Sequence, residues 1–183
     1  MRRLFAAVLA LALCAPYAAH ADDQSSDLIS FGAGFMDFDK SEPKRQSTDL
    51  RLEYRFGESL LPLLSTSFST KDDAQFHPFL GYEVTSRNAE YGVGGFVMDW
   101  DFCQHGIFSW SEGLGYFAHG DMSTLGSTFQ FRSQAEIGYR FDNNMRLTTE
   151  FSHISDAKTT RYNPGAEILG MYLHVPTSVL FGR

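Results

Sequence analysis

After its first 21 residues, the chain lacks any apolar run long enough to form a membrane-spanning helix. Such a helix needs about 20 mainly apolar residues, so the sequence excludes a helical membrane protein. It does not exclude a membrane β-barrel, because barrel strands alternate apolar and polar side chains and look mildly polar overall.

Cysteine and basic residues are also scarce. The chain has 2 cysteines, and 15 Lys and Arg against 22 Asp and Glu. If the N-terminal segment is removed, Cys103 alone remains and no internal disulfide can form. The acidic balance argues against nucleic acid as a partner. Stability must therefore come from packing, hydrogen bonding or a surrounding membrane.

The N-terminal segment is typical of a secretory signal peptide, residues 1–21. It has a basic start, an apolar stretch too short to span a membrane and a small-x-small cleavage site: Arg2-Arg3, Leu4–Ala15 and Ala19-His20-Ala21. A lipoprotein anchored at Cys14 is the alternative, but Leu13 is too large for the usual lipobox. We expect an exported mature chain, residues 22–183, that forms one domain.

What the sequence does have is aromatic residues in strand-like alternation. It contains 17 Phe, 8 Tyr and 2 Trp. Between Thr128 and Phe141 one parity is apolar and the other is polar or charged, and Leu50–Phe56 and Phe76–Val84 repeat the pattern. Because successive strand side chains point to opposite faces, each of these strands has one apolar and one charged face.

Two architectures can use such strands. A soluble sandwich or lipocalin-like barrel turns the apolar face inward, whereas a membrane barrel turns it outward and fills its interior with polar side chains. We favour the membrane barrel, because strands of about ten residues suit a tilted crossing and the polar face mixes both charge signs.

The pattern predicts an all-β fold, an eight-stranded antiparallel transmembrane β-barrel. The expected strands are Leu28–Phe38, Asp49–Phe56, Phe76–Thr85, Ala89–Phe102, Ile107–Ala118, Thr128–Phe141, Met145–Ser155 and Gly165–Val175. Leu60–Thr70 is a ninth candidate, which we interpret as an extension or connection because closed barrels normally have even strand numbers. Both termini are then periplasmic, and the loop Asp156–Pro164 lies at the outer end.

Three polar residues interrupt the apolar parity of the last two strands near that outer end. They are His153 and Ser155 on one strand and Glu167 on its antiparallel neighbour. A serine nucleophile needs a base within hydrogen-bond reach, and the base needs an orienting acceptor. The pattern therefore fits a Ser-His-Glu esterase site facing lipid. The alternative is a strand end at the hydrated membrane interface, where His and Ser are common without any catalytic role.

The segments His153-Ile154-Ser155-Asp156-Ala157 and Asn163-Pro164-Gly165-Ala166-Glu167 resemble the lipid A 3-O-deacylase family, PagL. The resemblance covers about the last 60 residues. It implies an eight-stranded outer-membrane barrel in which Ser155 is the nucleophile, His153 the general base and Glu167 its orienter. It also implies that Asn163 stabilises the oxyanion and that Phe131 lies close to the site.

The chain departs from that family at two site positions and at its end. Asp156 stands where the family usually has Asn, and a carboxylate beside the nucleophile would oppose oxyanion formation unless it is protonated or paired. Ser133 stands where some members have Asp. The chain also continues past the last strand as Thr177–Arg183.

The resemblance implies lipid A, or lipopolysaccharide, of the outer leaflet as the substrate, with no metal or organic cofactor. Two other functions remain open: a non-catalytic outer-membrane barrel with a structural or adhesive role, and a soluble periplasmic lipid-binding barrel. The sequence does not settle whether two copies pair as a homodimer or which acyl ester is cut.

Overall fold

The computed structural model describes residues 26–38, 40, 44–57 and 74–182. The expected signal peptide and the segment Leu60–Thr70 lie outside these residues. No helix in the described ranges is long and apolar enough to cross a membrane.

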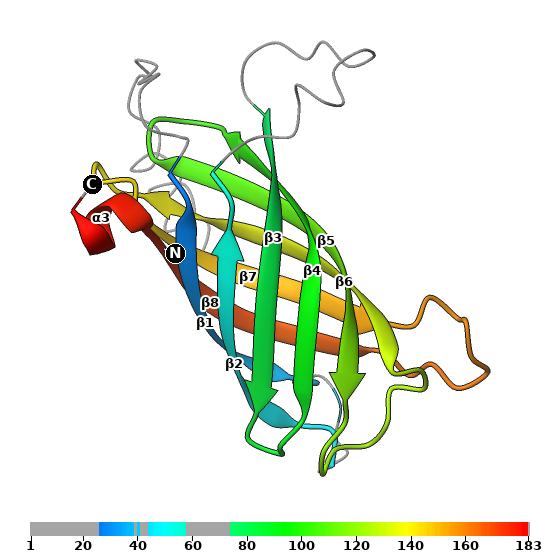
Figure 1. The fold of residues 1–183 in the computed structure, drawn as a ribbon. Coiled ribbons are helices and arrows are strands. Elements are labelled where there is room, and N and C mark those ends of the chain that lie inside the picture. Colours follow the sequence, from blue (N-terminus) through cyan, green and yellow to red (C-terminus); the bar gives the residue numbers. More distant parts are fainter. Residues whose placement is uncertain (1–25, 39, 41–43, 58–73, 183) are drawn as a thin grey trace, which may run out of the picture.

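Eight antiparallel strands form a closed barrel in which each strand pairs with its neighbour in sequence and β8 pairs with β1 (Figure 1). The predicted fold is confirmed, and each strand bound lies within two residues of its expected position. The strands are β1 (Leu28–Met36), β2 (Ser47–Arg55), β3 (Ala74–Thr85), β4 (Glu90–Asp101), β5 (Gly106–Ala118), β6 (Phe129–Arg140), β7 (Arg146–Ser155) and β8 (Ala166–Pro176).

The outward face of the barrel is apolar. Leu80 and Phe129 expose 60% and 62% of their surface, and large apolar residues on the outward face of the other strands are also exposed. Alternation along each strand sends the polar residues inward, where they are buried. This is the reverse of a soluble barrel and is the arrangement of a barrel surrounded by lipid.

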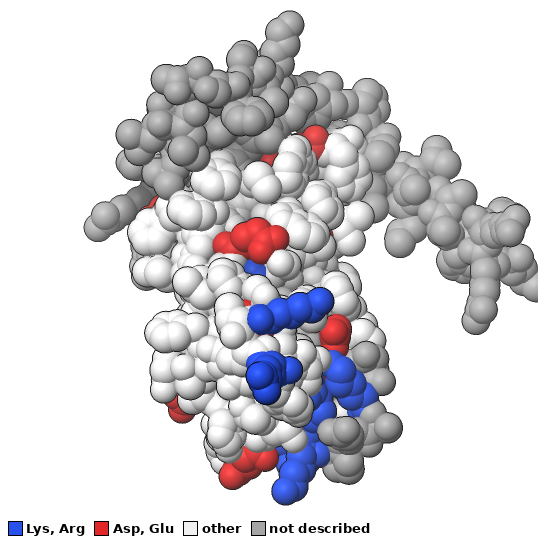
Figure 2. Space-filling model, turned by 90° about the vertical axis from the view of Figure 1, so that its right-hand side faces the viewer, with Lys and Arg blue, Asp and Glu red and all other residues white. Residues whose placement is uncertain are grey.

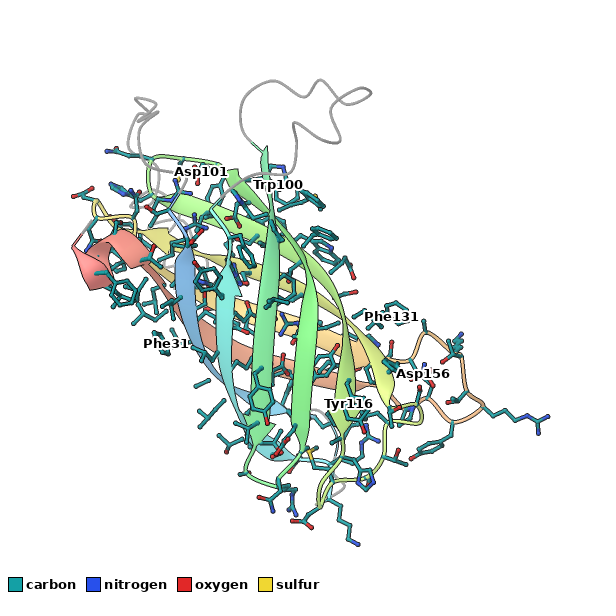
Figure 3. The ribbon with its side chains drawn as sticks, viewed as in Figure 1. Phe31, Trp100, Asp101, Tyr116, Phe131 and Asp156 are labelled. Atoms are coloured by element: carbon teal, nitrogen blue, oxygen red, sulfur yellow. The ribbon has the colours of Figure 1, made fainter. Side chains whose placement is uncertain are left out.

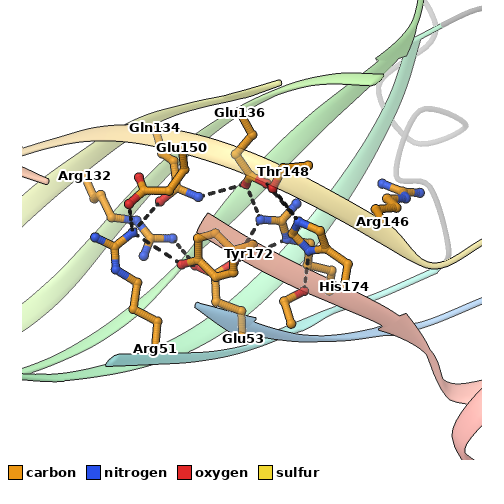
Figure 4. Close-up of polar contacts among 12 residues, drawn as sticks. Arg51, Glu53, Arg132, Gln134, Glu136, Arg146, Thr148, Glu150, Tyr172 and His174 are labelled. Carbon is orange, nitrogen blue, oxygen red and sulfur yellow. Dashed lines mark hydrogen bonds and ion pairs between the residues drawn. The ribbon is translucent and has the colours of Figure 1, made fainter. Parts of the chain in front are cut away.

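Charged side chains of both signs fill the interior (Figure 4). Arg132 Nη2 lies 2.5 Å from Glu53 Oε1, and Arg132 also pairs with Glu83. Arg51 Nη1 lies 3.0 Å from Glu150 Oε1. Buried charges are stable only when they are paired and hydrogen-bonded, so this network holds the wall together from inside.

The two ends of the barrel are finished differently. At the outer end, Met122 and Leu125 of the β5–β6 loop join a buried apolar cluster with residues of the strands. At the other end β8 ends at Pro176, and a short helix, α3 (Thr177–Phe181), follows it. The sequence did not predict α3, because a five-residue helix carries no periodic pattern.

Candidate active site

His153 and Glu167 meet on the outward face near the outer ends of β7 and β8. They are direct register partners, and His153 Nδ1 lies 3.2 Å from Glu167 Oε1. Their side chains are 45% and 24% exposed, so the pair faces the surroundings of the barrel and not its interior. A carboxylate on Nδ1 orients the ring and leaves Nε2 to exchange a proton.

Ser155 lies two residues beyond His153 on the same face, at the end of β7. Among the contacts of the described residues, none joins Ser155 to His153 by a hydrogen bond. Nucleophile and base are commonly farther apart before substrate binds. The register partner of Ser155 on β6 is Phe131, which is 44% exposed. Figure 3 shows Phe131 close to Asp156, where the strands meet the outer loop.

Gly165 sets the position of the His153 ring. Its φ is +62°, a conformation that favours glycine. A Cβ built on Gly165 would lie 2.8 Å from His153 Cε1 and 3.4 Å from Nε2. The backbone therefore packs against the ring edge that carries Nε2, and only glycine leaves room for it.

Lys40, in the β1–β2 connection, is a second partner of Glu167. Its Nζ lies 2.5 Å from Glu167 Oε2 and 3.0 Å from Asp37 Oδ1. Burial alone would lower the pKa of the Lys40 ammonium, but the hydrogen bonds to Glu167 and Asp37 outweigh it and raise the pKa. Lys40 is therefore a cation at neutral pH, and it holds the carboxylate that orients His153.

Asp37 ties this connection to β8. Its backbone N–H donates to Glu167 O at 2.6 Å, and Glu167 N–H donates to Asp37 Oδ1 at 3.2 Å. Arg45 Nη2 pairs with Asp37 Oδ2 at 2.9 Å and also donates to Gly165 O. Lys40, Asp37 and Arg45 were not singled out from the sequence, which showed only a polar loop there. The register would have indicated Asp37, because β1 and β8 already pair Met36 with Ile168.

Asp156 is fully buried and organises the outer loop. Its carboxylate accepts hydrogen bonds from the backbone N–H of Lys158 at 2.9 Å and of Thr160 at 3.2 Å, and from the Thr160 hydroxyl. Burial would raise its pKa, but these hydrogen bonds prevail and lower it. The carboxylate is therefore satisfied by hydrogen bonds within the loop. Ala157 and Lys158 have φ of +53° and +63°, a strained pair that this cap holds in place.

Asn163 lies in the same loop as Asp156 and contacts its backbone. Its Oδ1 accepts a hydrogen bond from the Asp156 backbone N–H at 3.2 Å. With the oxygen engaged, the amide N–H groups of Asn163 are the part left to contact a substrate. The structure thus brings His153 and Glu167 into contact and places Ser155 on the same face, opposite Phe131. Asp156 and Asn163 contact each other in the loop that follows Ser155, and no hydrogen bond or ion pair among the described residues joins them to the His153–Glu167 pair.

This geometry can now be compared with known proteins. The family model for lipid A 3-O-deacylase (PagL) matches residues 50–176. The chain belongs to this family. The match spans the candidate site, so the resemblance expected from the last 60 residues is confirmed over most of the barrel.

Solved structures show the same fold. The crystal structure of the outer membrane enzyme PagL has 17% sequence identity and a TM-score of 0.62, and the match covers 81% of this chain and 99% of that one. A de novo designed transmembrane β-barrel has 12% identity and a TM-score of 0.51, over 82% and 96% of the two chains. Among curated proteins, no sequence matches the chain.

Proposed function

We propose that the protein is an outer-membrane lipid A deacylase that hydrolyses the 3-O-linked acyl ester with Ser155, His153 and Glu167. The observation that carries the proposal is the His153–Glu167 hydrogen bond on the outward face, two residues from a serine of the same face. A polar pair in this position costs free energy beside lipid, and a role in acyl transfer accounts for its presence there. Membership of the deacylase family supports the same reaction.

The reaction begins when the ester lies against the wall at the outer ends of β7 and β8. His153 Nε2 takes the proton from Ser155 Oγ as the oxygen attacks the ester carbonyl carbon. Glu167 holds the imidazolium that forms, and Lys40 keeps Glu167 in place. The tetrahedral intermediate then collapses: the C–O bond to the sugar breaks and His153 returns the proton to the leaving oxygen.

The acyl group now rests on Ser155. Water, deprotonated by His153, attacks this second ester and releases the fatty acid, which regenerates the serine. Asn163 is assigned to the oxyanion of both tetrahedral intermediates, because its Oδ1 accepts from the Asp156 N–H and its amide N–H groups have no partner among the described residues. Phe131, the exposed register partner of Ser155, provides an apolar contact for the acyl chain.

The charge distribution suits an anionic lipid. Figure 2 shows a face of mostly uncharged side chains, with Lys and Arg, and a smaller number of Asp and Glu, toward the end that carries the outer loops. Basic residues at the edge of an apolar belt attract negatively charged headgroups and leave the acyl chains against the belt. This arrangement favours outer-leaflet lipid A as the substrate.

The test is mass spectrometry of lipid A after incubation with purified protein. We expect the wild type to remove one acyl chain, which fragmentation would assign to the 3-O position, and Ser155→Ala to remove none. Ser152→Ala is the matched control, because Ser152 is on the same strand but buried on the inner face. An unchanged acyl count with the wild type would favour a non-catalytic barrel. Full activity in Ser155→Ala would reject Ser155 as the nucleophile.

A further inference from the structure

A polar row continues across the barrel wall beyond the candidate triad. Register places His153 of β7 opposite Ser133 of β6, and Ser133 opposite Glu112 of β5. Neighbouring strands are about 4.8 Å apart, so the Cα atoms of His153 and Glu112 are roughly 10 Å apart. Glu112 therefore lies within the length of one lipid molecule from the reacting centre.

Glu112 is in an unusual place for a carboxylate. It is the central residue of the 13-residue β5 and is exposed on the outward face, between Trp110 and Leu114. Other outward carboxylate and imidazole side chains of the described strands lie within two residues of a strand end: Glu90, His153 and Glu167. Lipid-facing polar groups cost most near the middle of the membrane, so Glu112 needs a physical reason to be there.

The carboxylate is held in a fixed orientation. Trp110 Nε1 donates to Glu112 Oε1 at 2.9 Å, and Ser133 Oγ donates to Oε2 at 2.8 Å. Each carboxylate oxygen can accept more than one hydrogen bond, so acceptor capacity remains on the exposed side. Within the described part of the chain, no basic side chain pairs with Glu112. It is an oriented acceptor without a cation.

We propose that Glu112 accepts a hydrogen bond from a hydroxyl group on a fatty acyl chain of the substrate, so that the protein selects hydroxylated acyl chains. The mid-strand position of Glu112 places it at the depth of acyl chains and away from the headgroups. A neutral hydroxyl costs far less to bring into hydrocarbon than an ammonium group does. A preference in the rate of hydrolysis rests on the proposed function. A preference in binding does not, because binding needs no catalysis.

Binding can be measured without turnover, with Trp110 as the reporter. The chain has 2 Trp, so a Trp100→Phe, Ser155→Ala protein in phosphatidylcholine vesicles reports Trp110 fluorescence alone. The probes are methyl tetradecanoate and its derivatives with a hydroxyl at carbon 3, 7 or 11. We expect at least one hydroxylated ester to change the emission at a mole fraction about tenfold lower than plain methyl tetradecanoate requires. A tenfold difference is about the effect of one hydrogen bond to a charged group. Adding Glu112→Leu should abolish that difference.

Glu90→Leu is the matched control, because Glu90 is an outward carboxylate on neighbouring β4; it should keep the tenfold difference. Equal responses to all four esters, or an unchanged difference in Glu112→Leu, would overturn the proposal. Correct folding of each variant is checked by heat-modifiable gel mobility.

Hydrolysis of the same esters separates this proposal from the proposed function. We expect kcat/KM of the wild type and of Glu90→Leu to favour the preferred hydroxylated ester about tenfold, and Glu112→Leu to hydrolyse the hydroxylated and plain esters with equal kcat/KM. Hydrolysis without any preference overturns the role of Glu112 and leaves the deacylase proposal standing. No hydrolysis by the wild type overturns the deacylase proposal, and the fluorescence titration still decides the role of Glu112.

Discussion

Gly165→Ala should impair activity by displacing the His153 ring while the barrel stays folded. The new Cβ would lie 2.8 Å from His153 Cε1, whereas comfortable carbon contacts begin near 3.5 Å. The ring must therefore move by about 0.7 Å. Such a movement is enough to break a bond to Glu167 that is already 3.2 Å long.

Misplacement of a catalytic group by about 1 Å can cost about a hundredfold in rate, so we expect a loss of about ten- to a hundredfold in lipid A deacylation. The assay is the initial rate of fatty acid release, with heat-modifiable mobility to confirm folding. The backbone also contributes, because alanine at a left-handed φ costs about 1–2 kcal/mol.

Gly182→Ala isolates that backbone cost. Gly182 has φ of +66°, close to the +62° of Gly165, but a Cβ there would meet nothing within 4 Å. We expect Gly182→Ala to be fully active. If Gly165→Ala is as active as Gly182→Ala, the packing of Gly165 against His153 has no role in catalysis and the reasoning is refuted.

Three further predictions test the loop, the oxyanion contact and the interior. Asn163→Asp keeps the oxygen that accepts from Asp156 N–H but loses the amide donor, so kcat should fall about 100- to 1,000-fold; full activity would leave Asn163 with a capping role alone. The lowered pKa of Asp156 means that its contribution to loop stability is present above its unfolded pKa of about 3.9 and is lost as pH falls through the folded value. The protection of the Lys158 and Thr160 amides, taken relative to their intrinsic exchange rate at each pH, should therefore fall as the pH drops below about 4, but not in Asp156→Asn. Arg132→Met leaves Glu53 and Glu83 without their shared cation and should cost about 3–5 kcal/mol in urea unfolding; Arg161→Met, in the exposed loop, should cost less than about 0.5 kcal/mol.

The sequence predicts the barrel well, because alternation is a local signal. In β6, Phe131 and Ile137 face outward while Arg132 and Glu136 are buried, and this assignment needs parity alone. Parity also predicts that His153 and Glu167 share the outward face, but their direct pairing depends on the register of β7 and β8, which only the structure gives.

The parts that the sequence does not predict depend on non-local placement. Lys40 reaches Glu167 from a connection with no periodic pattern, so nothing local indicates the contact. Glu112 becomes notable only when the register across β5, β6 and β7 is known. Alternation is weak in the preceding strand, where Gly92, Gly94 and Gly95 have no side chains to define a face.

The most direct test of the central claim is covalent labelling with a lipid-soluble fluorophosphonate, which reacts with an activated serine. His153 has two candidate serines beside it: Ser155 on its own strand and Ser133 opposite it on β6. Peptide mass spectrometry should find one adduct, on Ser155, and none in His153→Ala. An adduct on Ser133, or no adduct on the folded wild type, would contradict the assignment of Ser155 as the nucleophile on the lipid-facing surface.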